Sequence, residues 1–141
     1  MHPNEDCIAT GTTTGKIILW YNYLAALNEI DINNQLEQNE EFDDGSEIMI
    51  NKKYLKKQQL KPTMTILHWH SLPVLSLAFS TEGSYLLSGG YECVLVKWLY
   101  KTGQKDFKPR LGAPINEIVC SLNNNIYASR QVDNCKILHY F

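Results

Sequence analysis

Hydrophobic residues gather in short runs along this chain, and turn-forming residues separate the runs. Three runs lie in the middle, at 73–80 (PVLSLAFS), 84–90 (SYLLSGG) and 93–100 (CVLVKWLY). They are rich in Val, Leu, Tyr and Trp, with Gly, Thr and Glu between them, so each run predicts a short β-strand. The turns at 81–83 and 91–92 would make these strands antiparallel neighbours. We expect the first run to be a buried inner strand.

The same plan appears on both sides of this middle set. Residues 65–70 (TILHWH) predict an outer strand followed by a turn. The C-terminal segment 113–141 predicts three strands, separated by an Asn-rich turn at 123–125 and an Asp-Asn turn at 133–134. Units of four short strands with Gly-bearing turns are typical of an all-β propeller.

An internal repeat supports this interpretation. Residues 8–20 (IATGTTTGKIILW) align with 86–98 (LLSGGYECVLVKW), and 127–139 (YASRQVDNCKILH) form a weaker third copy. The second and third copies are 41 residues apart, which fits a propeller blade, but the first two are 78 apart. The aligned positions are Thr10 with Ser88 and Ser129, Gly11 with Gly89, Ile18 with Val96 and Ile137, and Trp20 with Trp98 and His139.

The segment 24–63 accounts for the long first interval. It has no Gly-flanked pair of strands, and it carries an acidic cluster followed by a basic one, at Glu40, Glu41, Asp43 and Asp44 and then at Lys52, Lys53, Lys56 and Lys57. Such charge blocks are typical of solvated or disordered segments, so we interpret 24–63 as a charged inserted loop. Two roles stay open, namely docking of a partner and a tolerated surface insertion.

The sequence GTTTGK at 11–16 resembles a phosphate-binding loop. A Walker motif needs four residues between its glycines and a Ser or Thr after the lysine, whereas three residues lie between Gly11 and Gly15 and Ile17 follows the lysine. The residues that follow favour a strand, although a phosphate-binding loop opens a helix. We therefore expect Gly11 and Gly15 to shape a hairpin between two blade strands.

Composition limits the compartment and the binding partners. The chain has 141 residues, enough for one domain or a piece of one, and a formal net charge of -2, which gives no strong unspecific attraction to nucleic acid. Its four cysteines are far apart in sequence, which favours free thiols in a reducing compartment: Cys7, Cys93, Cys120 and Cys135. We expect neither a signal peptide nor a membrane span.

Residues 67–98 closely resemble a blade of the WD-repeat propeller family. That family ties the outer loop of a blade to its core with a polar tetrad of His, Ser or Thr, Asp and Trp. The resemblance implies that the tetrad here is His70, Ser88, Glu92 and Trp98. Two departures stand out: Glu92 adds a methylene that we expect to disturb the turn, and Trp69 takes the usual Gly place.

The other two copies of the repeat are degenerate. The first keeps the repeat-equivalent residues Thr10, Gly11 and Trp20 but has Thr14 at the acidic position. The third keeps Ser129 and Asp133 but has lost both the His and the Trp of the tetrad.

Other stretches, LHWH and KPRLGAPINEI above all, narrow the resemblance to WD-repeat proteins of the nucleolar small-subunit processome. This implies a non-enzymatic scaffold in the nucleus and nucleolus, supporting pre-rRNA processing, 18S maturation and transcription by RNA polymerase I. Its implied partners are other processome proteins, both WD-repeat and helical subunits, and pre-rRNA or snoRNA, with no cofactor, membrane or small-molecule substrate. The alternative is a generic WD-repeat interaction module of another complex.

The resemblance also implies that the chain is a fragment of about two to three blades. It divides into a partial blade at 1–23, the insertion at 24–63, a complete blade region at 64–108 and a partial blade at 109–141. Since unpaired sheet edges invite association, we expect the isolated chain to self-associate or to be marginally folded.

Few residues suggest reactive or binding chemistry. His68 and His70 have no nearby cysteine or carboxylate in the sequence to complete a ligand set, so we expect no metal site. Cys93 and Cys120 are expected in buried strands, where thiolates are disfavoured, and no catalytic triad can be assembled, which argues against an enzyme. Candidate RNA contacts are Lys101, Lys105, Lys108 and Arg110, with Tyr100 and Phe107 interleaved, although an exposed polar connecting loop would look the same.

Overall fold

The computed structural model describes residues 1–24, 27, 62–108, 111–123 and 126–140. The inserted segment therefore lies almost wholly outside the described residues, and its predicted disorder and its role stay predictions. In the described part of the chain, no helix is long and apolar enough to cross a membrane.

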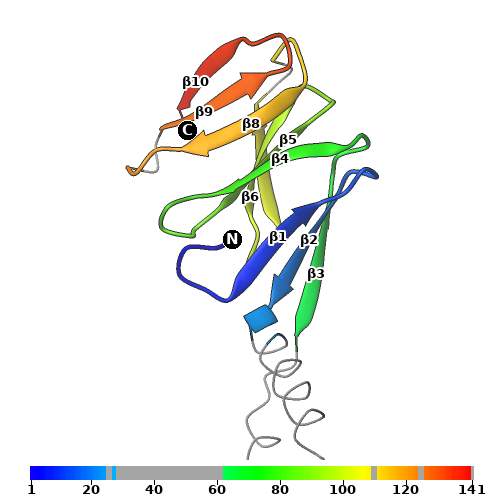
Figure 1. Cartoon of the computed structure of the whole chain (residues 1–141), viewed down its shortest axis with the longest axis vertical. Coiled ribbons are helices and arrows are strands. Elements are labelled where there is room, and N and C mark those ends of the chain that lie inside the picture. Colours follow the sequence, from blue (N-terminus) through cyan, green and yellow to red (C-terminus); the bar gives the residue numbers. More distant parts are fainter. Residues whose placement is uncertain (25–26, 28–61, 109–110, 124–125, 141) are drawn as a thin grey trace, which may run out of the picture.

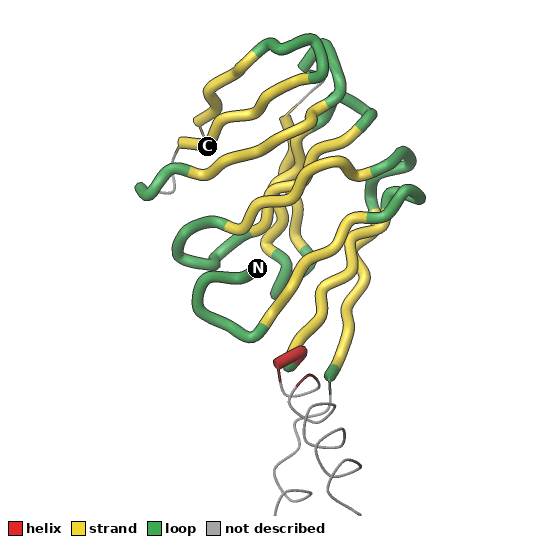
Figure 2. The backbone as a smooth tube through the Cα atoms, in the orientation of Figure 1, coloured by secondary structure: helices red, strands yellow, loops and turns green. Residues whose placement is uncertain are grey.

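In the described part of the chain, ten short strands form three antiparallel sheets, which follow one another along the molecule (Figure 1). The sheet orders are β1-β2-β3, β4-β5-β6-β7 and β10-β9-β8. Figure 2 shows the same three layers as yellow tubes joined by green turns. This arrangement confirms the predicted all-β, partial propeller. The strands are β1 (Cys7–Gly11), β2 (Lys16–Tyr21), β3 (Thr63–His68), β4 (Val74–Phe79), β5 (Leu86–Gly90), β6 (Leu95–Leu99), β7 (Gln104–Lys108), β8 (Ile115–Cys120), β9 (Ile126–Gln131) and β10 (Lys136–Tyr140).

The GTTTGK sequence forms the turn between β1 and β2, as predicted. The two strands pair from Cys7 opposite Tyr21 to Gly11 opposite Ile17. Gly15 has a φ of 78°, a left-handed conformation that glycine adopts without strain. A Cβ atom there would lie 2.1 Å from the carbonyl oxygen of His70, so the turn also packs closely on the loop after β3.

Two outer strands differ from the sequence interpretation. β3 pairs with β2, so the strand falls in the first sheet although the sequence grouped 64–68 with the complete blade region. The reason is that the sequence repeat begins one strand before the sheet does. β7 forms the fourth strand of the middle sheet, where we had allowed for a polar connecting loop. Its polar sequence hides the strand, which is stabilised by pairing with β6.

The middle sheet separates two hydrophobic clusters, and all of β5 is buried. The cluster toward the first sheet comprises Cys7, Ile17, Leu19, Leu67, Leu86, Val96, Trp98 and Tyr100. The cluster toward the last sheet comprises Tyr85, Leu87, Leu95, Ile115, Ile118 and Tyr127. The inner strand β4 is only half-buried, contrary to expectation, with Leu75 37% exposed. It contacts β1 and β8, the edge strands of the two neighbouring sheets.

One glycine lies at each junction between sheets. A Cβ atom at Gly11 would be 2.9 Å from Val74 Cβ, and one at Gly89 would be 2.7 Å from Ile115 Cγ2. Gly11 and Gly89 are equivalent in the repeat. The first residue of the next inner strand packs against each of them, namely Val74 of β4 against Gly11 and Ile115 of β8 against Gly89. Gly11 thus serves close sheet packing rather than the turn itself. The equivalent residue in the last sheet is Arg130, which pairs with Glu117 at 2.9 Å.

All four cysteines are free thiols. Cys7 is buried in the first cluster, and burial raises the pKa of the Cys120 thiol at the end of β8. We had expected Cys93 in a buried strand, and this expectation is wrong. Cys93 occupies the turn between β5 and β6 with a φ of 61° and is half-buried, because the turn needs a left-handed residue there. Cys135 is exposed.

Candidate functional site

The four tetrad residues lie in one hydrogen-bonded cluster of the middle sheet. The indole N–H of Trp98 donates to Ser88 Oγ at 2.8 Å, and His70 Nε2 lies 2.8 Å from the same oxygen. His70, Ser88 and Trp98 are all at most 2% exposed. Ser88 can accept from the indole and donate to His70 Nε2, which leaves the Nδ1–H of His70 for an acceptor.

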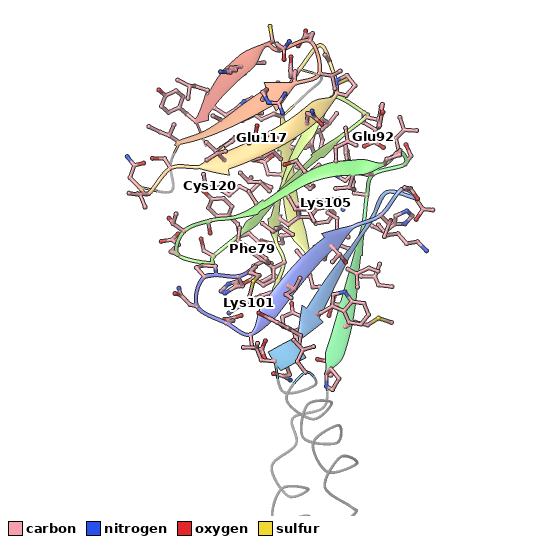
Figure 3. All side chains as sticks on the ribbon, in the orientation of Figure 1. Phe79, Glu92, Lys101, Lys105, Glu117 and Cys120 are labelled. Atoms are coloured by element: carbon pink, nitrogen blue, oxygen red, sulfur yellow. The ribbon has the colours of Figure 1, made fainter. Side chains whose placement is uncertain are left out.

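Glu92 provides that acceptor. Its Oε2 lies 2.6 Å from His70 Nδ1, and its Oε1 accepts from the backbone N–H of Leu72 at 2.9 Å and from Ser71. The Glu92 side chain spans from the β5–β6 turn to the loop before β4, and the expected effect of its extra methylene on the turn stays a prediction. Partial burial opposes ionisation, but the hydrogen bonds outweigh it and lower the pKa of Glu92. Figure 3 labels Glu92 at this rim of the molecule.

Trp69 fills the place of the usual glycine by stacking outward. Its ring lies 5.6 Å from that of Phe107 at an interplanar angle of 26°, which joins the end of the first sheet to β7. The same indole meets His70 edge to face at 5.2 Å. Phe107 nevertheless stays 53% exposed, so its outer face is open to a ligand or partner.

The flanking sheets contain reduced versions of the tetrad. In the first sheet, Trp20 Nε1 donates to Thr10 Oγ1 at 3.4 Å, and Trp20 is 39% exposed. In the last sheet, His139 takes the Trp position, and its Nε2 lies 2.8 Å from Ser129 Oγ. Asp133 stays within its own turn and accepts from the backbone N–H of Cys135.

The surroundings of His139 disfavour its charged form. It is 6% exposed and stacks on Tyr127, with ring centroids 5.0 Å apart and an interplanar angle of 12°. Burial lowers the pKa of His139, and the positive charge of Lys108 lowers it further.

The described residues offer few side chains that are arranged for metal binding or catalysis. Both ring nitrogens of His70 are engaged by Ser88 and Glu92, and His68 is exposed on β3. Within the described ranges, no three His, Cys, Asp or Glu side chains gather as metal ligands would.

The candidate RNA-binding residues do not form a single patch. Lys101 forms an ion pair with Glu5 in the N-terminal segment, near which Figure 3 labels it. Lys105 and Lys108 lie on β7 three residues apart, so their side chains leave opposite faces of the strand. Lys105 is opposite Trp98 on the face toward the first sheet, while Lys108 faces the last sheet. Arg110 lies outside the described residues.

One buried polar cluster has no clear signal in the sequence. His2 is 8% exposed, and its Nδ1 accepts from the backbone N–H groups of Asn4 and Glu5. Its Nε2 lies 2.7 Å from the Tyr100 hydroxyl and 3.0 Å from the Gly83 carbonyl oxygen. Burial raises the pKa of Tyr100 to about 12. This cluster fastens the N-terminal segment to the middle sheet.

Three successive antiparallel sheets, the middle one with four strands, and the tetrad define a WD-repeat propeller segment. A crystal structure of the Cps50 (Swd1) β-propeller domain from Myceliophteria thermophila shows the same fold, with a TM-score of 0.63 at 17% identity, and the match covers 100% of this chain and 34% of that one. This likeness speaks for the fold alone.

Sequence comparison gives the particular family. The profile of the WD repeat-containing protein 75 first β-propeller matches residues 40–134, and this chain belongs to that family. WD repeat-containing protein 75 of Xenopus laevis is 40% identical over 134 residues, which cover 94% of this chain. U3 small nucleolar RNA-associated protein 17 of Schizosaccharomyces pombe is 44% identical over 73 residues, 52% of this chain. The matched regions span 12% and 9% of those relatives.

Proposed function

We propose that this chain is part of a scaffold of the nucleolar small-subunit processome. In this role it supports pre-rRNA processing, 18S maturation and rRNA transcription by RNA polymerase I in the nucleus and nucleolus. The main support is membership of the WD repeat-containing protein 75 first-propeller family. The name of the fission yeast relative, which links it to U3 small nucleolar RNA, points in the same direction.

The scaffold acts through binding and performs no reaction. The polar side chains that could have formed an active site, His70, Ser88 and Glu92, bond to one another and to the neighbouring loop. Rigid sheets then leave the rim loops free to contact other processome proteins, both WD-repeat and helical subunits. No cofactor or small-molecule substrate is part of this proposal.

Within this proposal, the protein contacts RNA directly through Lys105 and Phe107. Both lie on the same face of β7, and Phe107 presents its exposed ring beside the cation. An aromatic face with a nearby cation suits an unstacked base and its phosphate. Lys101 contributes less because Glu5 already neutralises it.

The scaffold role is tested by capturing the full-length protein that contains this chain and measuring the RNA that accompanies it. We expect U3 small nucleolar RNA and 18S precursors to be enriched over capture of an unrelated WD-repeat protein. Protein partners without any enrichment of U3 RNA would instead indicate the alternative, a generic interaction module of another complex.

The RNA contact has its own test within the same full-length protein. Lys105→Glu should lower ultraviolet crosslinking to pre-rRNA several-fold, because phosphate attraction depends on local positive charge. Lys16→Glu, which changes an exposed lysine at the start of β2, is the matched control and should leave crosslinking unchanged. Equal crosslinking of both variants would contradict the proposed RNA contact. It would not affect the proposed role as a protein scaffold.

A further inference from the structure

The outer part of the junction between the first and middle sheets is open. In the pairing of β3 with β2, Thr65 lies opposite Leu19, which is fully buried in the cluster toward the middle sheet. Thr65 therefore points toward the middle sheet, as does Thr63 two residues earlier, and yet both are exposed. Only Leu67, further along the same face of β3, is covered. The two sheets thus diverge beside β3.

The strand that faces this opening is β7. Its Lys105 and Phe107 lie opposite Trp98 and Val96 of β6, which are buried in the cluster toward the first sheet. Lys105 and Phe107 therefore point into the same junction, and both are exposed. β3 and β7 are the outermost strands of their sheets. We call the surface between them the outer seam, and its residues are Thr63, Thr65, Lys105 and Phe107.

Trp69 closes one end of the outer seam and supports the ring of Phe107. The two rings are stacked, 5.6 Å apart at an angle of 26°, so Trp69 covers one face of Phe107. Because Phe107 is still 53% exposed, the open face of its ring is the one turned away from Trp69. Trp69 is itself held edge to face by His70, whose two ring nitrogens are fixed by Ser88 and Glu92. The tetrad thus holds a rigid aromatic platform.

The charge of the outer seam is positive. Among the described residues, no acidic side chain lies at the positions of β3 and β7 that point into the junction. Asp106 lies opposite Lys97 on the other face of the middle sheet. Lys105 takes part in none of the ion pairs of the described residues, whereas Lys101 is paired with Glu5. The surface therefore suits an anion that also has a flat face.

We infer that the outer seam binds single-stranded RNA, and that Trp69 is the positioning residue that holds Phe107 flat against one unpaired base. The inference rests on the proposed RNA contact and specifies its substrate class. Lys105 lies two residues from Phe107, about 6.5–7 Å along the strand, and its ammonium binds the adjoining phosphate. A paired base inside a duplex is stacked on both faces and cannot use the platform. An acidic protein segment matches the charge but offers no flat ring face to Phe107.

The preference for unpaired RNA is tested by fluorescence anisotropy on the full-length protein that contains this chain. The probe is a short labelled RNA, used as a single strand and annealed to its complement. Phe107→Leu keeps an apolar side chain on exposed β7 and removes the aromatic face, so it should weaken single-strand binding roughly fivefold or more. Duplex binding should not change. Equal losses for both RNA forms, or no loss for the single strand, overturn the inference.

The role of Trp69 is tested with the same single strand. Trp69→Ala should weaken binding roughly two- to tenfold, which is the range for the loss of an aromatic pair, and Trp69→Phe should restore most of it. Tyr91→Ala, which removes an aromatic ring that is 52% exposed in the β5–β6 turn, is the matched control and should have no effect. Equal losses in Trp69→Ala and Tyr91→Ala contradict the positioning role.

Salt dependence separates stacking from charge and does not follow from a general loss of structure. Lys105→Gln should reduce the slope of log affinity against log salt by about 0.7, because one phosphate contact is lost. Trp69→Ala should lower the affinity and leave this slope unchanged. A slope that changes equally in both variants contradicts the separate roles of the two residues.

Two outcomes distinguish this inference from the proposed function. If Lys105→Glu lowers crosslinking to pre-rRNA but Phe107→Leu and Trp69→Ala leave single-strand binding unchanged, the RNA contact stands and the platform is wrong. If excess polyglutamate displaces the single strand from the wild type but not from Phe107→Leu, the outer seam is a site for acidic protein segments, and the inference is overturned while the scaffold role remains.

Discussion

The carboxylate of Glu92 lies 2.6 Å from Nδ1 of His70 and joins the β5–β6 turn to the loop that enters the middle sheet. The same carboxylate accepts from the backbone N–H of Leu72. One side chain thus satisfies a buried imidazole and orders a rim loop. The longer Glu performs the role that Asp has in related blades, because its reach suits the distance between these two loops.

Removing this charge should destabilise the fold. In Glu92→Gln the single amide oxygen can accept either from His70 or from the Leu72 N–H, and the amide NH₂ then faces another donor. We expect a loss of about 1–3 kcal/mol in the free energy of unfolding, measured with urea. Glu82→Gln is the control, since Glu82 is exposed and its carboxylate accepts from Ser84 alone among the bonds described. Equal losses in the two variants would show that Glu92 has no special role.

The junction between the middle and last sheets should be sensitive to one added methyl group. Because a Cβ atom at Gly89 would lie 2.7 Å from Ile115, Gly89→Ala should lower the free energy of unfolding by about 1–3 kcal/mol. Combining it with Ile115→Ala removes the contacts of Cγ2 at 2.7 Å and Cδ1 at 3.1 Å, while Cβ at 2.8 Å remains. The double variant should therefore lose less than the sum of the two single losses. Strict additivity in a double-mutant cycle would contradict direct packing of these residues.

Stability should decrease as the solution becomes acidic through the region where His139 titrates. Burial lowers the pKa of His139 in the folded state below 6.5, so the unfolded chain takes up this proton first as the pH falls. The contribution of His139 is thus present above pH 6.5 and is lost below it. Comparing unfolding at about pH 7.5 and about pH 5.5, we expect a smaller loss in His139→Gln than in the wild type. An unchanged loss in His139→Gln would refute this assignment.

The strands and the tetrad could be predicted because their signals are local or periodic. Apolar runs marked β4, β5 and β6, and the repeat singled out Ser88 and Trp98. The resemblance to the WD-repeat family added His70, and the three residues lie together in the structure. β7 was not recognised, since its polar residues become a strand only by pairing with β6.

Contacts that depend on distant partners could not be predicted. The burial of His2 requires Gly83 and Tyr100, which are brought to it by tertiary packing and not by any sequence interval. Lys105 and Lys108 likewise lie on opposite faces because they are three residues apart on a strand. This could not be predicted while the segment was interpreted as a connecting loop.

Hydrogen exchange of the indole N–H groups, followed by NMR, tests the central structural claim that a buried Ser hydroxyl holds the complete blade together. Trp98 is 2% exposed and donates to Ser88 at 2.8 Å, whereas Trp20 is 39% exposed and its bond to Thr10 is 3.4 Å long. We predict that the Trp98 indole proton exchanges slowly, with the global unfolding of the blade, while that of Trp20 exchanges rapidly. Equally rapid exchange of both indole protons would contradict the account.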